Sequence, residues 1–363
     1  MILTRVSLTG FRNYTKKSFP FNPGVTLVLG PNASGKTNIL EAISALSAGK
    51  SFRADRDAEM IRWGSELARV QGTADDTVLE LVITTGQVGG RTVPGKKYLV
   101  NGVSRRPADF AGQLRTVLFW PEDMELVTDS PGLRRRYMDR VLSQVDREYR
   151  RNLLSYERGI RQRNRLLELI NEGKSSRTQL IFWNQLLIKS GGYITDARGN
   201  FLEYVSRQVI PGMTLRISYD KSVISETRLE EYRDEEVAAK ATLVGPHRDD
   251  CIFQMRHSDN TDWLDLSRFG SRGEQRMGVL WLKLAEVAFI TERAGNKPLL
   301  LLDDILSELD TAHRDLVIEL IRQHQVIVTS AEEDAAEVLQ KHRIPYDTVR
   351  LPADDRSGAG AVK

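Results

Sequence analysis

The feature that most constrains this chain is Gly30-Pro-Asn-Ala-Ser-Gly-Lys-Thr37, which fits the pattern G-x-x-x-x-G-K-[ST]. An apolar run at residues 25–29, typical of a buried strand, precedes it, and apolar residues at helical spacing follow it from residue 37. A turn between a strand and a helix presents backbone N–H groups and a helix N-terminus to an anion. The sequence therefore predicts a phosphate-binding loop in an α/β domain.

Within this loop, two side chains carry specific expected roles. Lys36 is expected to neutralise the β- and γ-phosphate oxygens and to act catalytically, and the Thr37 hydroxyl is expected to bind Mg²⁺. Ala33 stands where such loops often have glycine, so the turn either avoids a positive φ or tolerates it. The candidate ATP-binding residues of the loop are Gly30, Pro31, Asn32, Ala33, Ser34, Gly35, Lys36, Thr37 and Asn38.

A second nucleotide motif follows far along the chain, where four leucines at 299–302 precede Asp303 and Asp304. The leucines predict a fully buried parallel strand, and a carboxylate at its end points into the crevice where open α/β sheets bind ligands. Asp303 is therefore a candidate Mg²⁺ ligand, direct or indirect. Asp304 is a candidate catalytic residue that polarises the attacking water. The alternative is that both acids cap the next helix.

The middle of the chain differs in character from both ends. Residues 131–206 show helical periodicity, and strands are expected at 214–217, 242–244 and 251–253. A helix from about 274 to 290 then opens with Gly270-Ser-Arg-Gly-Glu-Gln275. A serine at a helix start is usually a cap, but its hydroxyl and the free N–H groups also suit an anion.

Taken together and in order, these motifs resemble ABC-type ATPases of chromosome maintenance and repair. The resemblance is most specific to the RecF family of bacterial recombination mediators. It spans roughly residues 1–330. The segments that carry it are Phe11–Tyr14, Gly30–Asn38, Phe119–Asp123, Leu243–Asp250, Ser271–Arg276 and Leu302–Asp310.

The resemblance implies an α/β fold in which an ABC-type P-loop ATPase lobe, with a mixed sheet around the P-loop helix, carries an inserted, mainly helical second lobe. We expect residues 1–125 and 297–363 to form the ATPase lobe. Residues 126–296 are expected to form the second lobe, with a helical arm, a small sheet and the signature turn.

The resemblance also implies site residues. Lys36, Thr37 and Asp303 would bind MgATP, with Arg12 and Asn13 near the nucleotide base. Ser271 and Gly273, together with Asp310, would contact ATP held by the partner subunit of an ATP-dependent homodimer. The implied function is a slow ATPase switch that clamps DNA at gaps or duplex/single-strand junctions. It would help RecA loading together with RecR and RecO, in DNA repair, replication and the SOS response.

Charge distribution carries the argument for DNA, because the chain is only +3 overall. Between residues 134 and 165 the sequence has eleven arginines and four acidic residues. This suits contact with a phosphate backbone, although a solvated or dimer-contacting face is the alternative. The candidate DNA-binding residues are Arg134, Arg135, Arg136, Arg147 and Arg151.

Composition excludes several other classes. The single cysteine, Cys251, excludes an intrachain disulfide framework, and no run approaches the ~18 apolar residues of a membrane span. The N-terminus lacks a signal peptide pattern, so we expect a cytoplasmic protein. A transporter ATPase would have a histidine after residues 326–330, and a structural chromosome ATPase would have a long coiled coil between its motifs. The sequence has neither feature. An ATP-switched scaffold whose DNA contact is indirect stays open.

Overall fold

The computed structural model describes residues 1–257, 261–308 and 311–352, with side chains described outside 307, 308 and 311–313. The chain divides into two compact units. Unit 1 comprises Met1–Pro121 and Ile290–Lys363, and unit 2 comprises Glu122–Phe289. The divisions therefore lie at 121/122 and 289/290, against expected boundaries at 125/126 and 296/297.

A five-stranded parallel sheet in unit 1 follows the apolar runs of the sequence. Its order is β10-β14-β15-β3-β16, and every described pair is parallel. Both β3 and β14 are buried along their whole length, as expected for strands covered on both faces. The register pairs Asp303 with Thr329 and Thr329 with Val28, so the carboxyl ends of β14, β15 and β3 meet. The strands are β3 (Val25–Leu29), β10 (Thr116–Phe119), β14 (Leu299–Asp303), β15 (Val326–Ser330) and β16 (Tyr346–Arg350).

Unit 1 also contains a six-stranded antiparallel sheet, in the order β2-β1-β4-β5-β8-β9. In β4 and β5, buried residues alternate with more accessible ones, because one face of the sheet packs on the core. The strands are β1 (Leu3–Phe11), β2 (Tyr14–Pro20), β4 (Leu67–Ala74), β5 (Thr77–Thr84), β8 (Lys96–Val100) and β9 (Val103–Arg105), with a separate ribbon of β6 (Gln87–Val88) and β7 (Arg91–Thr92).

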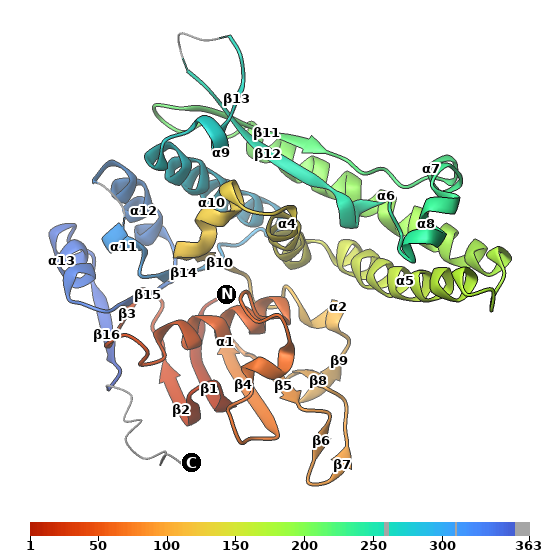
Figure 1. Ribbon diagram of the computed structural model, residues 1–363. Coiled ribbons are helices and arrows are strands. Elements are labelled where there is room, and N and C mark those ends of the chain that lie inside the picture. Colours follow the sequence, from red (N-terminus) through yellow and green to blue (C-terminus); the bar gives the residue numbers. More distant parts are fainter. Residues whose placement is uncertain (258–260, 309–310, 353–363) are drawn as a thin grey trace, which may run out of the picture. The chain divides into compact units, whose positions relative to one another are not determined.

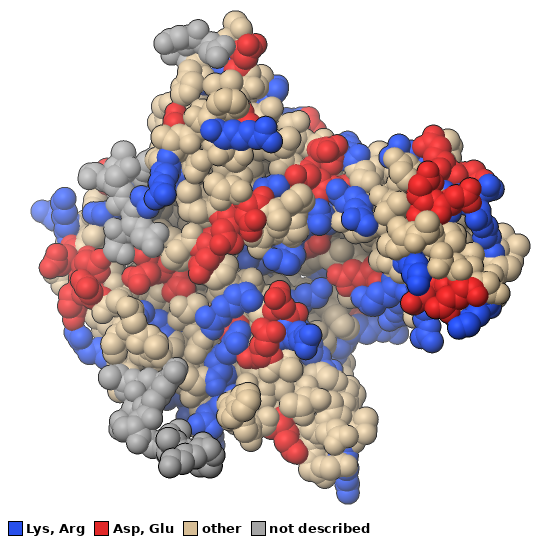
Figure 2. Space-filling view, viewed as in Figure 1, with Lys and Arg blue, Asp and Glu red and all other residues tan. Residues whose placement is uncertain are grey.

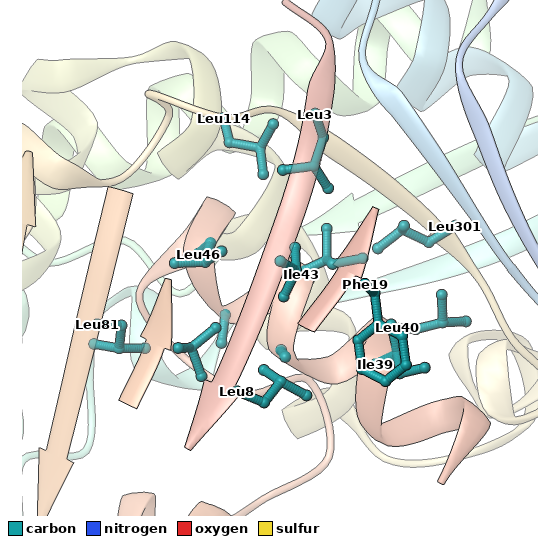
Figure 3. Close-up of a cluster of buried hydrophobic side chains, with 14 of the residues drawn as sticks. Leu3, Leu8, Phe19, Ile39, Leu40, Ile43, Leu46, Leu81, Leu114 and Leu301 are labelled. Carbon is teal, nitrogen blue, oxygen red and sulfur yellow. The ribbon is translucent and has the colours of Figure 1, made fainter. Parts of the chain in front are cut away.

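Helix α1 (Lys36–Ala48) lies in the core of unit 1 and contacts both sheets. It is buried around most of its circumference, as expected of a helix covered on more than one side. Figure 3 shows Ile39, Leu40, Ile43 and Leu46 of this helix among leucines that come from both sheets. Each such fully buried side chain contributes about 1.5–3 kcal/mol. This packing fixes the helix whose N-terminus forms the phosphate loop.

The other elements of unit 1 flank the two sheets (Figure 1). They are η1 (Asp57–Met60), α2 (Pro107–Phe110), α11 (Ile305–Glu308), α12 (Thr311–Gln323) and α13 (Asp334–Lys341), and η2 (Pro121–Met124) begins at the last residue of the first segment.

Unit 2 is built on two long helices, α5 (Arg147–Asn171) and α6 (Ile181–Ser206), which pack on each other (Figure 1). The Asp146 side chain caps α5 by accepting from the N–H groups of Glu148 and Tyr149. The remaining helices are α3 (Glu125–Thr128), α4 (Pro131–Val145), η3 (Arg177–Leu180), α7 (Glu226–Glu231), α8 (Arg233–Ala239), η4 (Pro246–Arg248), α9 (Leu266–Phe269) and α10 (Arg272–Ala294), which runs on into unit 1.

A three-stranded antiparallel sheet in unit 2 has the order β11 (Thr214–Asp220), β12 (Asp250–Arg256), β13 (Leu264–Asp265). The expected strand at 242–244 is wrong, because this segment has no strand partner. Asn164 Oδ1 instead accepts from both the N–H and the hydroxyl of Thr242, and the Thr242 carbonyl contacts His247 Nε2. Side chains thus satisfy the backbone groups that a strand would have paired.

A buried ionic cluster joins helices α4 and α6 in the helical arm of unit 2. Arg198 of α6, 3% exposed, donates to Asp139 of α4 at 2.8 Å and to Asp249 at 3.1 Å. Asp249 is fully buried and also accepts from the Ser222 N–H and the Tyr219 hydroxyl. A buried charge is tolerated only when it is paired and hydrogen-bonded in this way.

Candidate nucleotide site and signature turn

The phosphate loop adopts the strained backbone that its glycines predict. Gly35 has a φ of 102° at the N-cap of α1, and a Cβ there would meet Asn13 Nδ2 and the Tyr14 hydroxyl, each at 2.7 Å. Ala33 has a φ of 65°, so the turn tolerates a positive φ at this non-glycine position. Pro31 and Asn32 are exposed at the tip of the loop.

Lys36 curls back over the loop, as a phosphate-binding lysine must. Its side chain is 7% exposed, and Nζ donates to the carbonyls of Gly30 at 2.7 Å and Pro31 at 3.2 Å. The buried Ser34 Oγ in the same loop has no hydrogen-bond partner among the described residues. An ammonium and an unpartnered hydroxyl beside a helix N-terminus suit phosphate oxygens.

A short chain of hydroxyl and carboxylate groups joins the loop to the neighbouring strand ends. The Thr37 hydroxyl donates to Asp303 Oδ1 at 3.2 Å, and the Thr329 hydroxyl donates to the same oxygen at 2.6 Å. Asp303 is 6% exposed. Mg²⁺ prefers such hard oxygen ligands and uses few from the protein. Thr37 and Asp303 present oxygens of this kind side by side.

Asp304 lies directly beyond this pair in a left-handed conformation, with a φ of 56°. Its N–H donates to the Thr329 carbonyl at 3.2 Å. Burial raises the pKa of the Asp304 carboxyl, the neighbouring Asp303 and Asp334 raise it further, and Lys36 opposes them. A carboxyl that holds its proton more readily suits a group that takes a proton from water.

Arg12 and Asn13 reach the loop from its side. Asn13 Nδ2 donates to the Ser34 carbonyl at 3.2 Å and Asn13 Oδ1 accepts from Asn38 Nδ2 at 2.8 Å. Arg12 has a φ of 50°, and its guanidinium donates to both carboxylate oxygens of Glu41, at 2.8 and 2.5 Å. Asn13 thus supports the loop backbone, and Arg12 is fixed against α1.

Sequence reasoning missed Glu41. This carboxylate is fully buried and also accepts from Arg53 at 2.8 Å and Ser51 at 2.6 Å. Burial raises the pKa of Glu41, but the hydrogen bonds from Arg12, Arg53 and Ser51 outweigh it and hold the pKa below its usual range. The one available signal was a lone acid within the apolar stripe of α1.

The signature turn is a capping box at the start of α10. The Ser271 hydroxyl and N–H both donate to Glu274 Oε2, at 2.7 and 2.8 Å, and Ser271 Oγ accepts from the Glu274 N–H at 3.3 Å. The bonds from Ser271 lower the pKa of Glu274. A Cβ at Gly273 would approach only Ser271 Oγ, at 3.9 Å, so the backbone here is open to a ligand.

Gly270 and Gln275 fix this turn against α9. A Cβ at Gly270 would lie 2.6 Å from the Leu266 carbonyl, and Gln275 Nε2 donates to three backbone carbonyls, including those of Leu266 and Gly270. Asp310, and the side chain of Glu308, lie outside the described residues.

The candidate DNA-binding arginines differ in environment, and one expectation is wrong. Arg134 is 9% exposed, with Asp250 bound at 2.7 and 3.0 Å and the Asp129 carbonyl at 2.6 Å, so it is committed within unit 2. Arg135 donates to the Asp249 carbonyl at 2.7 Å. Arg136, Arg147 and Arg151 are exposed.

Three further arginines on α5 are placed like Arg147 and Arg151 and unlike Arg134. Arg158, Arg161 and Arg165 are exposed and share one helical face with Arg147 and Arg151 through steps of three, four and seven residues. Figure 2 shows acidic and basic side chains intermixed over the visible face of the arm, so no patch of a single charge covers it.

A phosphate loop after β3, a carboxylate at the end of β14 two strands away and a signature turn in an inserted helical unit define the class of ABC-type P-loop ATPases. The family model for the RecF/RecN/SMC N terminal domain matches residues 2–345. The DNA replication and repair protein RecF of Moorella thermoacetica is 36% identical over 91% of this chain and 90% of its own length.

Two solved structures of the recombination mediator protein RecF in the RecFOR pathway are similar throughout. The one with ATPrS has a TM-score of 0.82 at 29% identity, covering 97% of this chain and 96% of that chain. The one with ATP has a TM-score of 0.81 at 30% identity, covering 91% and 92%. The chain belongs to the RecF family.

In the described part of the chain, none of the helices has the length and apolarity needed to cross a membrane.

Proposed function

We propose that this chain is an ATP-dependent DNA-binding protein of recombinational repair, in which ATP closes two copies into a clamp on gapped or junction DNA. The observation that carries the proposal is the bonded chain from Thr37 through Asp303 to Thr329 beside the Lys36 loop. RecF relatives solved with ATP and ATPrS share this fold.

The residues of unit 1 divide the work of holding MgATP. The N–H groups of the loop and Lys36 bind the phosphates, and the unpartnered Ser34 hydroxyl lies in the same cradle. Thr37 and Asp303 would hold the Mg²⁺, which neutralises charge on the β- and γ-phosphates. Asn13 holds the loop backbone through the Ser34 carbonyl.

The second half of each site comes from another copy. Ser271 and Gly273 lie at an exposed helix start, where the free N–H groups and the positive end of the helix dipole attract a γ-phosphate. In the single chain the Ser271 hydroxyl donates to Glu274. ATP therefore joins the phosphate loop of one copy to the signature turn of the next, and Asp310 belongs to the same contact.

Hydrolysis is slow, so ATP acts as a switch. Asp304 is one methylene shorter than the glutamate found at this position in many relatives, and its φ of 56° fixes the backbone that carries it. Strand β15 ends in Thr329 and Ser330, without the histidine of transporter ATPases. RecR and RecO are the expected partners in loading RecA.

The test is DNA binding at a fixed salt concentration. Titration into a fluorescent gapped duplex would be run without nucleotide, with ADP and with ATP. We expect ATP alone to tighten binding, and Lys36→Met to abolish that gain. Lys17→Met, which changes an exposed lysine of β2, should retain it. DNA affinity that ignores ATP in the unaltered protein would overturn the proposal and favour the scaffold alternative.

A further inference from the structure

The outer face of the three-stranded sheet in unit 2 carries an aromatic ring flanked by two arginines. The guanidinium carbon of Arg216 on β11 lies 4.1 Å from the ring centroid of Trp263, and that of Arg256 on β12 lies 4.9 Å from it. Trp263 directly precedes β13, so three neighbouring segments contribute one residue each.

This face is not part of the core. The opposite face carries the buried side chains of Leu215, Ile217, Phe253 and Met255 and contacts α6 through β11. On the outer face Arg256 is exposed, and Arg216 and Trp263 are partly exposed. Figure 2 shows basic side chains over this part of β11 and β12.

The two arginines carry uncompensated charge among the described residues. Among the described residues, Arg216 Nε donates to Gln254 Oε1 at 2.8 Å, and neither guanidinium has a carboxylate partner. Asp265 on β13 lies nearer, but it accepts from the N–H and hydroxyl of Ser267 and faces Arg268 at 3.6 Å. The acids Asp220 and Asp250 pair at the far end of β11 and β12, and Asp250 binds Arg134.

A guanidinium stacked on an indole keeps its in-plane N–H groups available to an anion, while the flat surfaces accept another flat group. Single-stranded nucleic acid offers both, as phosphates and unstacked bases along one backbone, and strand-borne aromatics with basic neighbours are the usual way to bind it. An acidic peptide would supply the charge without the flat faces.

We propose that Arg216, Arg256 and Trp263 form a contact site for single-stranded DNA on the outer face of the β11–β12–β13 sheet. The site is separate from the arginines of α5 and rests on the proposed DNA-binding function. It gives the protein a means to distinguish the single-stranded part of a gap from duplex.

The test is binding of a short labelled oligothymidylate to the full chain with ATP. Trp263→Ala should weaken binding roughly five- to hundredfold, the range for one lost base stack. Arg216→Ala/Arg256→Ala should make the dependence of log affinity on log salt shallower by about 1 to 1.5, since each phosphate contact on a single strand contributes about 0.7. Blunt duplex should bind all variants as it binds the unaltered protein.

Two further variants separate contact from folding. Trp263→Phe keeps a ring, so it should retain most of the affinity while losing most of the tryptophan quenching that oligothymidylate causes. Arg228→Ala is the matched control, because Arg228 lies 5.0 Å over the Tyr232 ring but is paired with Glu231 at 3.6 Å. It should bind within about twofold of the unaltered protein, the change expected of an ion pair at the surface.

The outcomes distinguish this inference from the proposed function. If the unaltered protein binds no DNA with any nucleotide, both are wrong. If it binds DNA and the three substitutions at this site leave oligothymidylate binding unchanged, only this inference is wrong. The single-strand assignment would also be overturned if the variants lost as much affinity for blunt duplex as for oligothymidylate. The same holds if polyglutamate competed for the site as well as unlabelled oligothymidylate does.

Discussion

Two neighbouring residues at the end of β14 differ sharply in environment. Asp303 accepts hydrogen bonds from Thr37 and Thr329, which orient its carboxylate toward the loop. Asp304 next to it is in the left-handed region, with a raised pKa caused first by burial. In the function that we propose, Asp303 binds the cation and Asp304 takes the proton.

The first prediction concerns Thr329, whose hydroxyl donates to Asp303 at 2.6 Å and accepts from the Asp304 N–H at 3.2 Å. Thr329→Val should raise the Mg²⁺ concentration needed for ATP binding about 10- to 100-fold, since groups that orient a metal ligand typically have this effect. Thr329→Ser keeps the hydroxyl and should restore the dependence. Nucleotide fluorescence titrated against Mg²⁺ measures it, and identical curves for Val and Ser would contradict the orientation role.

The second prediction concerns the pH dependence of stability at Asp304. Because its pKa is raised in the folded chain, the charged form destabilises the fold, and the loss appears as pH rises through the folded pKa. Asp304→Asn should therefore raise Tm at pH 7, with the advantage vanishing below about pH 3.9, where both states are protonated. Thermal melts across this range test it, and a constant difference at all pH values would contradict the sign.

The same substitution removes the group that we propose polarises water. ATP hydrolysis by Asp304→Asn should fall at least about a hundredfold, the lower range for a general base, while ATP binding persists. Hydrolysis at the unaltered rate would show that Asp304 only ends the strand.

At the scale of elements, the turn between α9 and α10 has both a structural and a proposed functional role. Ser271 and Glu274 form a capping box, and this contact alone explains a serine at the position. The two roles separate when a substitution keeps the cap but changes the charge presented to a γ-phosphate.

The third prediction uses that separation. Ser271→Asp keeps an N-cap acceptor for the Glu274 N–H but cannot donate to Glu274 Oε2, so its free energy of unfolding should fall by about 1 kcal/mol. Its negative charge should abolish ATP-dependent dimerisation, measured by sedimentation. Ser271→Ala should lose about 1 kcal/mol of stability. An Asp variant that dimerises normally with ATP would leave only the capping role.

The fourth prediction concerns the arm. Arg198→Met leaves Asp139 and Asp249 without their buried partner and should cost about 3–5 kcal/mol of unfolding free energy in unit 2. Arg207→Ala, at the C-cap of α6, removes an exposed pair with Glu203 and should cost less than about 0.5 kcal/mol. Urea denaturation measures both, and equal costs would contradict the assignment of Arg198 as a buried tie.

The sequence predicts the elements around the phosphate loop because local spacing and apolar runs determine them. Lys36, Thr37 and Asp303 lie where their motifs place them relative to β3, α1 and β14. The environments of Glu41 and Arg134 could not be predicted, because each depends on contacts with residues distant in the chain. Charge patterning alone cannot distinguish Arg134, which is buried against Asp250, from the exposed Arg158.

At the scale of the whole molecule, the two halves of the expected ATP site belong to different compact units. Unit 1 holds the phosphate loop and Asp303, and unit 2 holds Ser271 and Gly273. In our account the halves meet only between two copies, and ATP is the group that joins them. In this account ATP binding leads to DNA binding, because ATP pairs the two copies and their paired arms then hold the DNA.

The most direct test is to mix two inactive variants and measure ATP-dependent binding to gapped DNA. Lys36→Met lacks a working loop and Ser271→Arg lacks a working signature turn. In a mixed dimer one site combines the intact loop of the second variant with the intact turn of the first. We predict that the mixture recovers part of the ATP-dependent affinity that neither variant shows alone. A mixture no better than its components would contradict a site shared between copies.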